Sequence, residues 1–175
     1  RQEWRAPLRE AMDWLRDTLV PLYVDRMNSY VSDPWRARDD YIRIIHDRSE
    51  ASVDAFFFDH GFRPLSSEDR VQARRLLEMQ RNALLMYTSC GWFFDDISGI
   101  EPVQVMQYAC RAMQLLRDAT GLDLEPEYLD IIRNASSNLP EYGNGADVYR
   151  TYVKTAAIDP ARVGFHFALS SLVAE

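Results

Sequence analysis

Lysine, cysteine and glycine are all scarce in this chain of 175 residues. Lys154 is the only lysine among the 20 basic residues, and the chain has two cysteines and seven glycines. The two cysteines, Cys90 and Cys110, cannot form a disulfide framework or a cysteine-rich metal motif. We therefore interpret both as small buried hydrophobic side chains in a protein of a reducing compartment.

Long apolar runs are also missing. Stretches such as residues 83–87 are far shorter than the roughly 20 apolar residues that a membrane-spanning helix needs. The start of the chain shows no signal-peptide pattern, so we expect a cytoplasmic protein. The chain opens on Arg1 inside a helical pattern, and we expect residues 1–175 to be one helical domain that is a piece of a longer protein.

The charge balance argues against a nucleic acid as the partner. The formal net charge is −7 and the pI is about 5.0, which repels a phosphate backbone. Guanidinium groups bind phosphate well, but the arginines here are scattered and alternate with Asp and Glu. We expect neither a nucleic acid nor a membrane as a partner.

Apolar residues recur at spacings of three and four along most of the chain, which is the pattern of helices that bury one face. The expected helices cover residues 7–31, a segment opening at Pro34, residues 52–60, a long helix from about 67 to 88, residues 102–120, a shorter helix from Glu125, residues 146–154, and a last helix from Pro160. Pro21 predicts a kink or a break in the first of them. No segment alternates with period two, so the fold class is all-α, a helical bundle around two long central helices without significant sheet.

Several residues predict where these helices begin, end and bury their faces. Asp33 is placed to cap one helix and Ser66 another. Gly61 is placed to end a helix with positive φ, and Gly121 to stop the helix that covers 102–120. The buried side after Asp33 is expected at Trp35, Tyr41, Ile42 and Ile45, and the apolar run 83–87 is expected to be buried all round.

Residues 88–99 do not fit a short turn between two helices. The segment places three consecutive aromatic residues and two consecutive carboxylates between two glycines: Gly91, Trp92, Phe93, Phe94, Asp95, Asp96 and Gly99. The glycines permit positive φ, so the backbone can turn sharply at both ends. A pyranose stacks its apolar face on an aromatic ring, and carboxylates accept hydrogen bonds from its hydroxyl groups.

A purely structural interpretation of this segment remains open. Trp92 and the two phenylalanines can cap the end of the bundle, because aromatic clusters in helical proteins are usually core. Asp95 or Asp96 can then act as the N-cap of a following turn.

The central run resembles a C-terminal domain of unknown function that is attached to proteins with a family 57 glycoside-hydrolase catalytic region. The run is EMQRNALLMYTSCGWFFDDISGIE at residues 78–101. The similarity covers nearly the whole chain and includes WRAPLR at 4–9, DPW at 33–35 with RDDY at 38–41, and SNLPEYG at 137–143.

This resemblance implies that residues 1–175 are a C-terminal fragment of a longer glycoside hydrolase-like protein, with an accessory role beside its catalytic domain. Family 57 enzymes process α-glucans with retention, using a Glu nucleophile and an Asp acid on an N-terminal barrel, and a helical region after the barrel helps to close the substrate cleft. Nothing in this chain resembles the barrel, so the resemblance places no catalytic residue here and implies that the segment alone is inactive.

One stretch of the family's helical region has a counterpart here. In the branching enzymes it reads Ser-Ser-Asp-Trp-Pro-Phe, and its Trp lines the cleft. Residues 89–94 are similar to it, with Trp92 matching the Trp and Phe94 the Phe, whereas Cys90-Gly91 and Phe93 depart from it. The substrate-binding residues implied are Trp92, Phe93, Phe94, Asp95 and Asp96.

The expected function is therefore an accessory helical domain that braces the catalytic barrel and lines part of the α-glucan cleft. The expected partner is the barrel of the same polypeptide, with an α-glucan and a second copy of the chain as further candidates. The alternative is a non-catalytic helical module for protein interaction or oligomerisation.

Other reactive residue types carry no site. The three histidines, His46, His60 and His166, are far apart in the sequence and show no spacing typical of metal ligands, so we expect structural or surface roles and no metal or cofactor. Ser89 and Cys90 have no neighbouring base, which a nucleophile requires.

Overall fold

The computed structural model describes residues 2–157 and 159–173. Its helices are α1 (Arg5–Met27), α2 (Pro34–Asp39), α3 (Ile42–His46), α4 (Glu50–Asp59), α5 (Ser67–Leu85), α6 (Ile100–Thr120), α7 (Glu125–Ile132), α8 (Gly145–Val148) and α9 (Pro160–Val173), with short helical turns η1 (Ser89–Trp92), η2 (Pro140–Tyr142), η3 (Tyr149–Val153) and η4 (Lys154–Ala156). The described residues form no strand, and one isolated bridge joins Ser136 to Asn144. The all-α class is confirmed.

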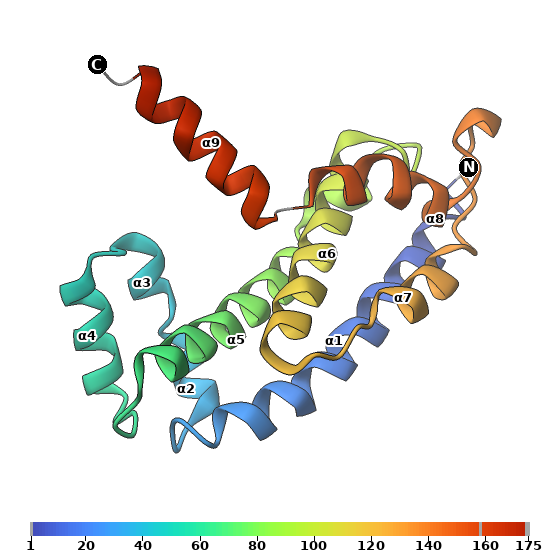
Figure 1. Ribbon diagram of the computed structural model, residues 1–175. Coiled ribbons are helices and arrows are strands. Elements are labelled where there is room, and N and C mark those ends of the chain that lie inside the picture. Colours follow the sequence, from blue (N-terminus) through green and yellow to red (C-terminus); the bar gives the residue numbers. More distant parts are fainter. Residues whose placement is uncertain (1, 158, 174–175) are drawn as a thin grey trace.

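The long helices α5 and α6 pack against each other more extensively than any other pair of described elements. Helix α1 lies against α5 and α7, and η3 packs on α6 (Figure 1). Helices α2, α3 and α4 lie near the N-terminal end of α5 (Figure 1). The predicted bundle around two long central helices is therefore present, and the segment 88–99 is the connection between those two helices.

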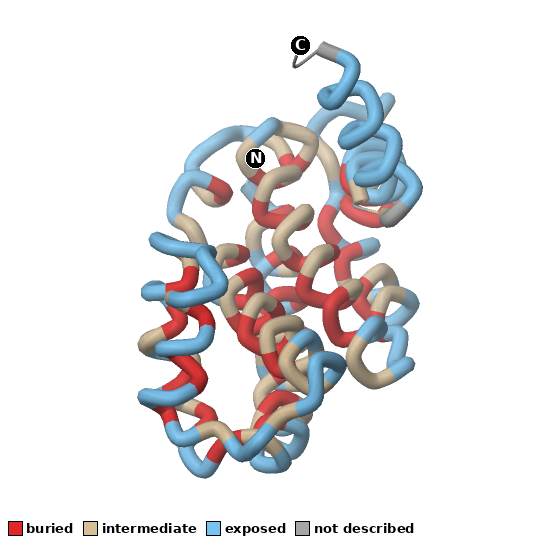
Figure 2. The backbone as a smooth tube through the Cα atoms, turned by 60° about the vertical axis from the view of Figure 1, so that its left-hand side comes forward, coloured by how far each residue is buried: buried red, intermediate tan, exposed pale blue. Residues whose placement is uncertain are grey.

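The core lies where the helices face one another, and the outer surfaces are exposed (Figure 2). Helix α1 contributes a stripe of fully buried side chains at Leu8, Met12, Leu15 and Leu19, spaced by four, three and four residues as the sequence predicted. Burying each such side chain contributes about 1.5–3 kcal/mol. No helix among the described residues is both long and apolar enough to cross a membrane.

Helix α1 continues through Pro21, so of the predicted kink or break, the break is wrong. Pro21 is exposed, whereas Leu19 and Tyr23 on either side of it are fully buried. Proline removes one main-chain hydrogen bond from a helix. The buried residues that flank Pro21 keep α1 packed against the core where this hydrogen bond is missing.

The predicted helix ends are confirmed where a side chain or a glycine determines them. The Asp33 carboxylate accepts a hydrogen bond from the Arg36 amide at 3.0 Å, and Ser66 forms a capping box with Asp69. Gly61 ends α4 with a φ of +61° and Gly121 ends α6 with a φ of +79°.

Three expected burials are wrong, those of Ile42, Leu84 and Cys90. Ile42 is 54% exposed and Leu84 is 59% exposed, while Ile44 is buried instead. The chain forms two short helices, α2 and α3, rather than one, so the periodicity of the first does not carry into the second. Of the two cysteines, Cys110 is buried as expected and Cys90 is exposed.

Helix α9 projects away from the rest of the molecule (Figure 1). Its large apolar side chains are therefore exposed, namely Val163, Phe165, Phe167, Leu169 and Leu172.

Candidate functional site

The aromatic segment lies at the surface of the bundle, where η1 leads from α5 towards α6. Trp92 is half-buried against the core, while Phe93 is 71% and Phe94 is 50% exposed. Asp95 is exposed and Asp96 is partly buried. The five predicted site residues therefore include two aromatic rings that solvent reaches.

Gly91 allows η1 to approach α6 closely. A Cβ atom at this position would lie 2.6 Å from Cγ1 of Val105, which is too close. Gly91 and Gly99 do not use the positive φ that glycine permits: positive φ among the described glycines occurs elsewhere, and Gly99 has a φ of −62°. Glycine is needed at 91 for space rather than for backbone freedom.

Asp96 joins two loops that are about 40 residues apart in the sequence. Its carboxylate accepts hydrogen bonds from the amide and the hydroxyl of Ser98 at 2.9 and 2.7 Å. It also accepts from the Ser137 hydroxyl at 2.9 Å and from the amide of Asn138. Burial alone would raise the pKa of Asp96, but the bonds from Ser98, Asn138 and Ser137 outweigh burial and lower it. The ionised carboxylate thus holds the loop in place.

The main-chain carbonyl groups of the same loop are held from two directions. The indole Nε1 of Trp4 donates to the Asp95 carbonyl at 3.1 Å, and the Asn138 side-chain amide donates to the same oxygen. Arg5 donates to the Phe94 carbonyl at 3.4 Å. These contacts fix the backbone that carries the two exposed phenylalanines.

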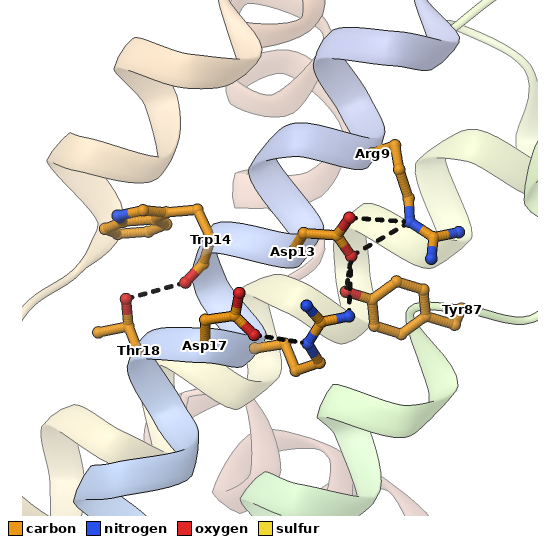
Figure 3. Close-up of polar contacts among 7 residues, drawn as sticks. Arg9, Asp13, Trp14, Asp17, Thr18 and Tyr87 are labelled. Atoms are coloured by element: carbon orange, nitrogen blue, oxygen red, sulfur yellow. Dashed lines mark hydrogen bonds and ion pairs between the residues drawn. The ribbon is translucent and has the colours of Figure 1, made fainter.

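Arg9 links the aromatic segment to the long helices. Its guanidinium carbon lies 5.9 Å from the centroid of the Trp92 ring and 4.8 Å from that of the Tyr87 ring, within the range of a cation–π interaction. Its Nε donates to both carboxylate oxygens of Asp13, at 3.1 and 3.2 Å (Figure 3).

Asp13 is the centre of this charged cluster (Figure 3). It accepts a 2.6 Å hydrogen bond from the Tyr87 hydroxyl and a 3.0 Å bond from Arg16 Nη1. Burial would raise the pKa of Asp13, but the bonds from Tyr87 and Arg9 lower it further than burial raises it. Burial and the bond to Asp13 raise the pKa of Tyr87, so this phenol stays protonated.

Sequence reasoning missed the residues that hold the site. Trp4 and Ser137 fall within the short motifs at 4–9 and 137–143. These motifs carried the resemblance to the family but did not indicate what the two side chains contact. Arg9 and Asp13 are four residues apart on α1, a spacing that places them on one helix face. No local signal predicts that Tyr87 and Trp92 meet them.

The arrangement is suited to binding rather than to bond cleavage. It offers aromatic rings, an exposed carboxylate at Asp95 and a guanidinium at Arg9, whereas the Asp96 carboxylate is already engaged by its loop. Within the described part of the chain, no group of three or more His, Cys, Asp or Glu side chains could hold a metal ion.

Together, the fold and the site define an all-helical domain that presents an aromatic loop held by hydrogen bonds from two other segments. The family described as "Domain of unknown function (DUF3536)" matches residues 1–175. The chain belongs to this family. Comparisons with curated proteins and with solved structures gave no match.

Proposed function

We propose that this chain is the accessory helical domain of a family-57-like carbohydrate-active enzyme, where it braces the catalytic barrel and lines part of the α-glucan cleft. The observation that carries the proposal is the exposed pair Phe93 and Phe94 beside half-buried Trp92. Aromatic rings at the surface provide the apolar platforms on which sugar rings stack.

The hydrogen bonds around the loop support this role because a rigid platform loses little entropy when a ligand binds. Trp4, just before α1, donates to the Asp95 carbonyl of the loop, and the Asp96 carboxylate ties the loop to Ser137. In this proposal the three aromatic residues of 92–94 stack on glucose units and Asp95 accepts hydroxyl hydrogen bonds. Asp96 is a positioning residue that acts through the loop.

Catalysis is assigned to the barrel of the parent protein and not to this chain. A retaining glycosidase needs two carboxyl groups about 5–5.5 Å apart across the substrate. The resemblance places that pair on the barrel, and Asp96 accepts four bonds from its own loop and its neighbour. We expect no release of reducing ends when the purified chain is incubated with maltooligosaccharides.

The binding role is tested by titrating the chain with maltoheptaose and following main-chain amide NMR shifts. The proposal expects saturable shifts confined to residues 89–99 and their contacts, and at least a tenfold loss of affinity in Phe93→Ala/Phe94→Ala. Phe58→Ala is the control, because Phe58 is 86% exposed on α4. Absence of saturable shifts, or equal weakening by the control, would overturn the proposal.

The alternative function, a helical interaction module, is favoured by a different observation, the exposed apolar surface of α9. Light scattering on the chain and on Phe165→Ser/Phe167→Ser tests it. Association that the double variant abolishes supports this module. A chain that stays monomeric at high concentration counts against self-association.

A further inference from the structure

Three arginines converge on a pocket between α1, α2 and α5. The pocket has a volume of about 350 Å³, and Arg9 and Arg16 of α1, Arg38 of α2 and Gln80 of α5 line it. No carboxylate is among its lining residues in the described structure, although the chain as a whole has a net charge of −7. This local excess of hydrogen-bond donors sets the pocket apart from the rest of the acidic surface.

Neighbouring carboxylates hold each guanidinium without using all of its donors. Arg9 gives Asp13 its Nε, and its terminal nitrogens turn away from that carboxylate (Figure 3). Arg16 gives Nε to Asp17 and Nη1 to Asp13. A guanidinium carries five N–H donors, so both groups are fixed in orientation and keep donors for a further acceptor.

Arg38 follows the same pattern from the opposite side. It gives Nε and Nη2 to Asp39 at 2.9 and 2.5 Å, and its guanidinium carbon lies 4.8 Å from the Trp35 ring centroid. Its side chain is only 28% exposed. The stacked and paired guanidinium therefore lies at the pocket in one orientation.

Gln80 provides an independent observation. This residue is 3% exposed, and its Nε2 has no hydrogen-bond partner. Buried amide groups are almost always paired in folded proteins, and this unpaired donor belongs to a residue that lines the arginine pocket. The three guanidinium groups and the Gln80 amide nitrogen are donors, which favours an anion as the ligand.

We propose that this pocket binds a small organic oxyanion, with a carboxylate or phosphate head group on a short apolar body. Guanidinium groups bind both head groups through paired N–H donors. Val20, Ala83 and Leu84 form an apolar wall for the body of the ligand, and the volume lies at the lower end of small-molecule sites. The inference does not rest on the carbohydrate proposal, because the pocket does not include residues 92–96, although Arg9 lies beside both.

The test titrates the chain with phenyl phosphate, benzoate and, as the neutral analogue, phenol, at constant ionic strength by calorimetry. The proposal expects saturable binding of at least one anion and none of phenol, and the anion that binds more tightly identifies the head group. Arg38→Gln should weaken binding at least tenfold, whereas Arg133→Gln, an exposed arginine on the end of α7, should leave it unchanged.

Gln80→Leu separates ligand binding from folding. Removal of a buried unpaired amide should raise the melting temperature, while the loss of its donor should weaken anion binding several-fold. A variant that is more stable yet binds more weakly cannot owe its weaker binding to misfolding.

Phenylglyoxal modification of the unaltered chain gives a second measurement that needs no variant. The bound anion should slow the modification of Arg9, Arg16 and Arg38 at least fivefold, as read by peptide mass spectrometry, and leave Arg133 unaffected. Absence of saturable anion binding, unchanged affinity in Arg38→Gln, or equal protection of all arginines would overturn the proposal.

Discussion

The hydroxyl of Tyr87 donates a 2.6 Å hydrogen bond to the carboxylate of Asp13, although the two residues are 74 positions apart. This contact joins the segment after α5 to the middle of α1. Arg9 and Arg16 both place their guanidinium groups over the Tyr87 ring and both bond to Asp13. Tyr87 therefore lines the arginine pocket, and Arg9, which lies over both the Tyr87 and the Trp92 rings, connects it to the aromatic segment.

Tyr87→Phe should lower the free energy of unfolding by about 1–2 kcal/mol, below the upper part of the roughly 1.5–3 kcal/mol range for hydrogen bonds to charged groups, because the site is partly exposed. Urea denaturation measures it, and a double-mutant cycle with Asp13→Asn isolates the pair. Additive single effects would show that the bond does not couple α1 to Tyr87.

The same contact should weaken in acid. Because the folded pKa of Asp13 lies below its ordinary value, its contribution is complete above the ordinary aspartate pKa of about 4 and is lost as pH falls through the folded pKa. The stability difference between the wild-type chain and Tyr87→Phe should therefore narrow below about pH 4.

Gly91→Ala should destabilise the chain by about 1–3 kcal/mol, as overpacking of a tight contact does. The new methyl group would meet Cγ1 of Val105, so Val105→Ala should restore part of the loss when the two changes are combined. Gly61→Ala is not a suitable control because its φ is positive. Thermal melts of the single and double variants check this, and a double variant no better than Gly91→Ala would contradict the close approach.

His60 should make stability fall as pH falls from about 7 to 5. Burial lowers the pKa of His60 below its ordinary value, more than nearby Asp40 raises it. The unfolded chain therefore binds a proton near pH 6.5 that the folded chain takes up only at lower pH. The centroid of the His60 ring lies 4.5 Å from the centroid of the Phe56 ring.

His60→Leu should remove most of this pH slope in denaturation experiments, whereas His46→Gln, at an exposed position, should keep it. An unchanged slope in His60→Leu would assign the pH dependence to other groups.

The sequence predicts the features of this fold that depend on neighbouring residues. Asp33 and Ser66 cap their helices because an N-cap needs only the next three residues, and Gly121 ends α6 because its own φ is positive. Leu84 is exposed because burial depends on what lies opposite, which helical periodicity does not specify. Pro21 stays helical for the same reason, since tertiary packing overrides a local helix breaker.

The candidate site could be predicted only in part. The composition of residues 92–96 indicates a surface with aromatic and acidic groups, and the exposed Phe93 and Phe94 provide one. The residues that hold the loop come from elsewhere in the chain: Trp4 is 91 positions from Asp95 and Ser137 is 41 positions from Asp96. Contacts at such separations leave no periodic pattern in a single sequence.

Two tryptophans beside the same loop should respond differently to replacement by alanine. Trp4 is 1% exposed and donates to the Asp95 carbonyl, so Trp4→Ala should cost about 3–5 kcal/mol, as for other buried aromatic residues. Trp92 is only half-buried, so Trp92→Ala should cost about 1–2 kcal/mol, since part of its ring already contacts water. Urea denaturation of both variants, followed by circular dichroism, measures the difference. If Trp92→Ala destabilises the chain as much as Trp4→Ala, the indole is a core residue and its proposed place in a sugar-binding cleft fails.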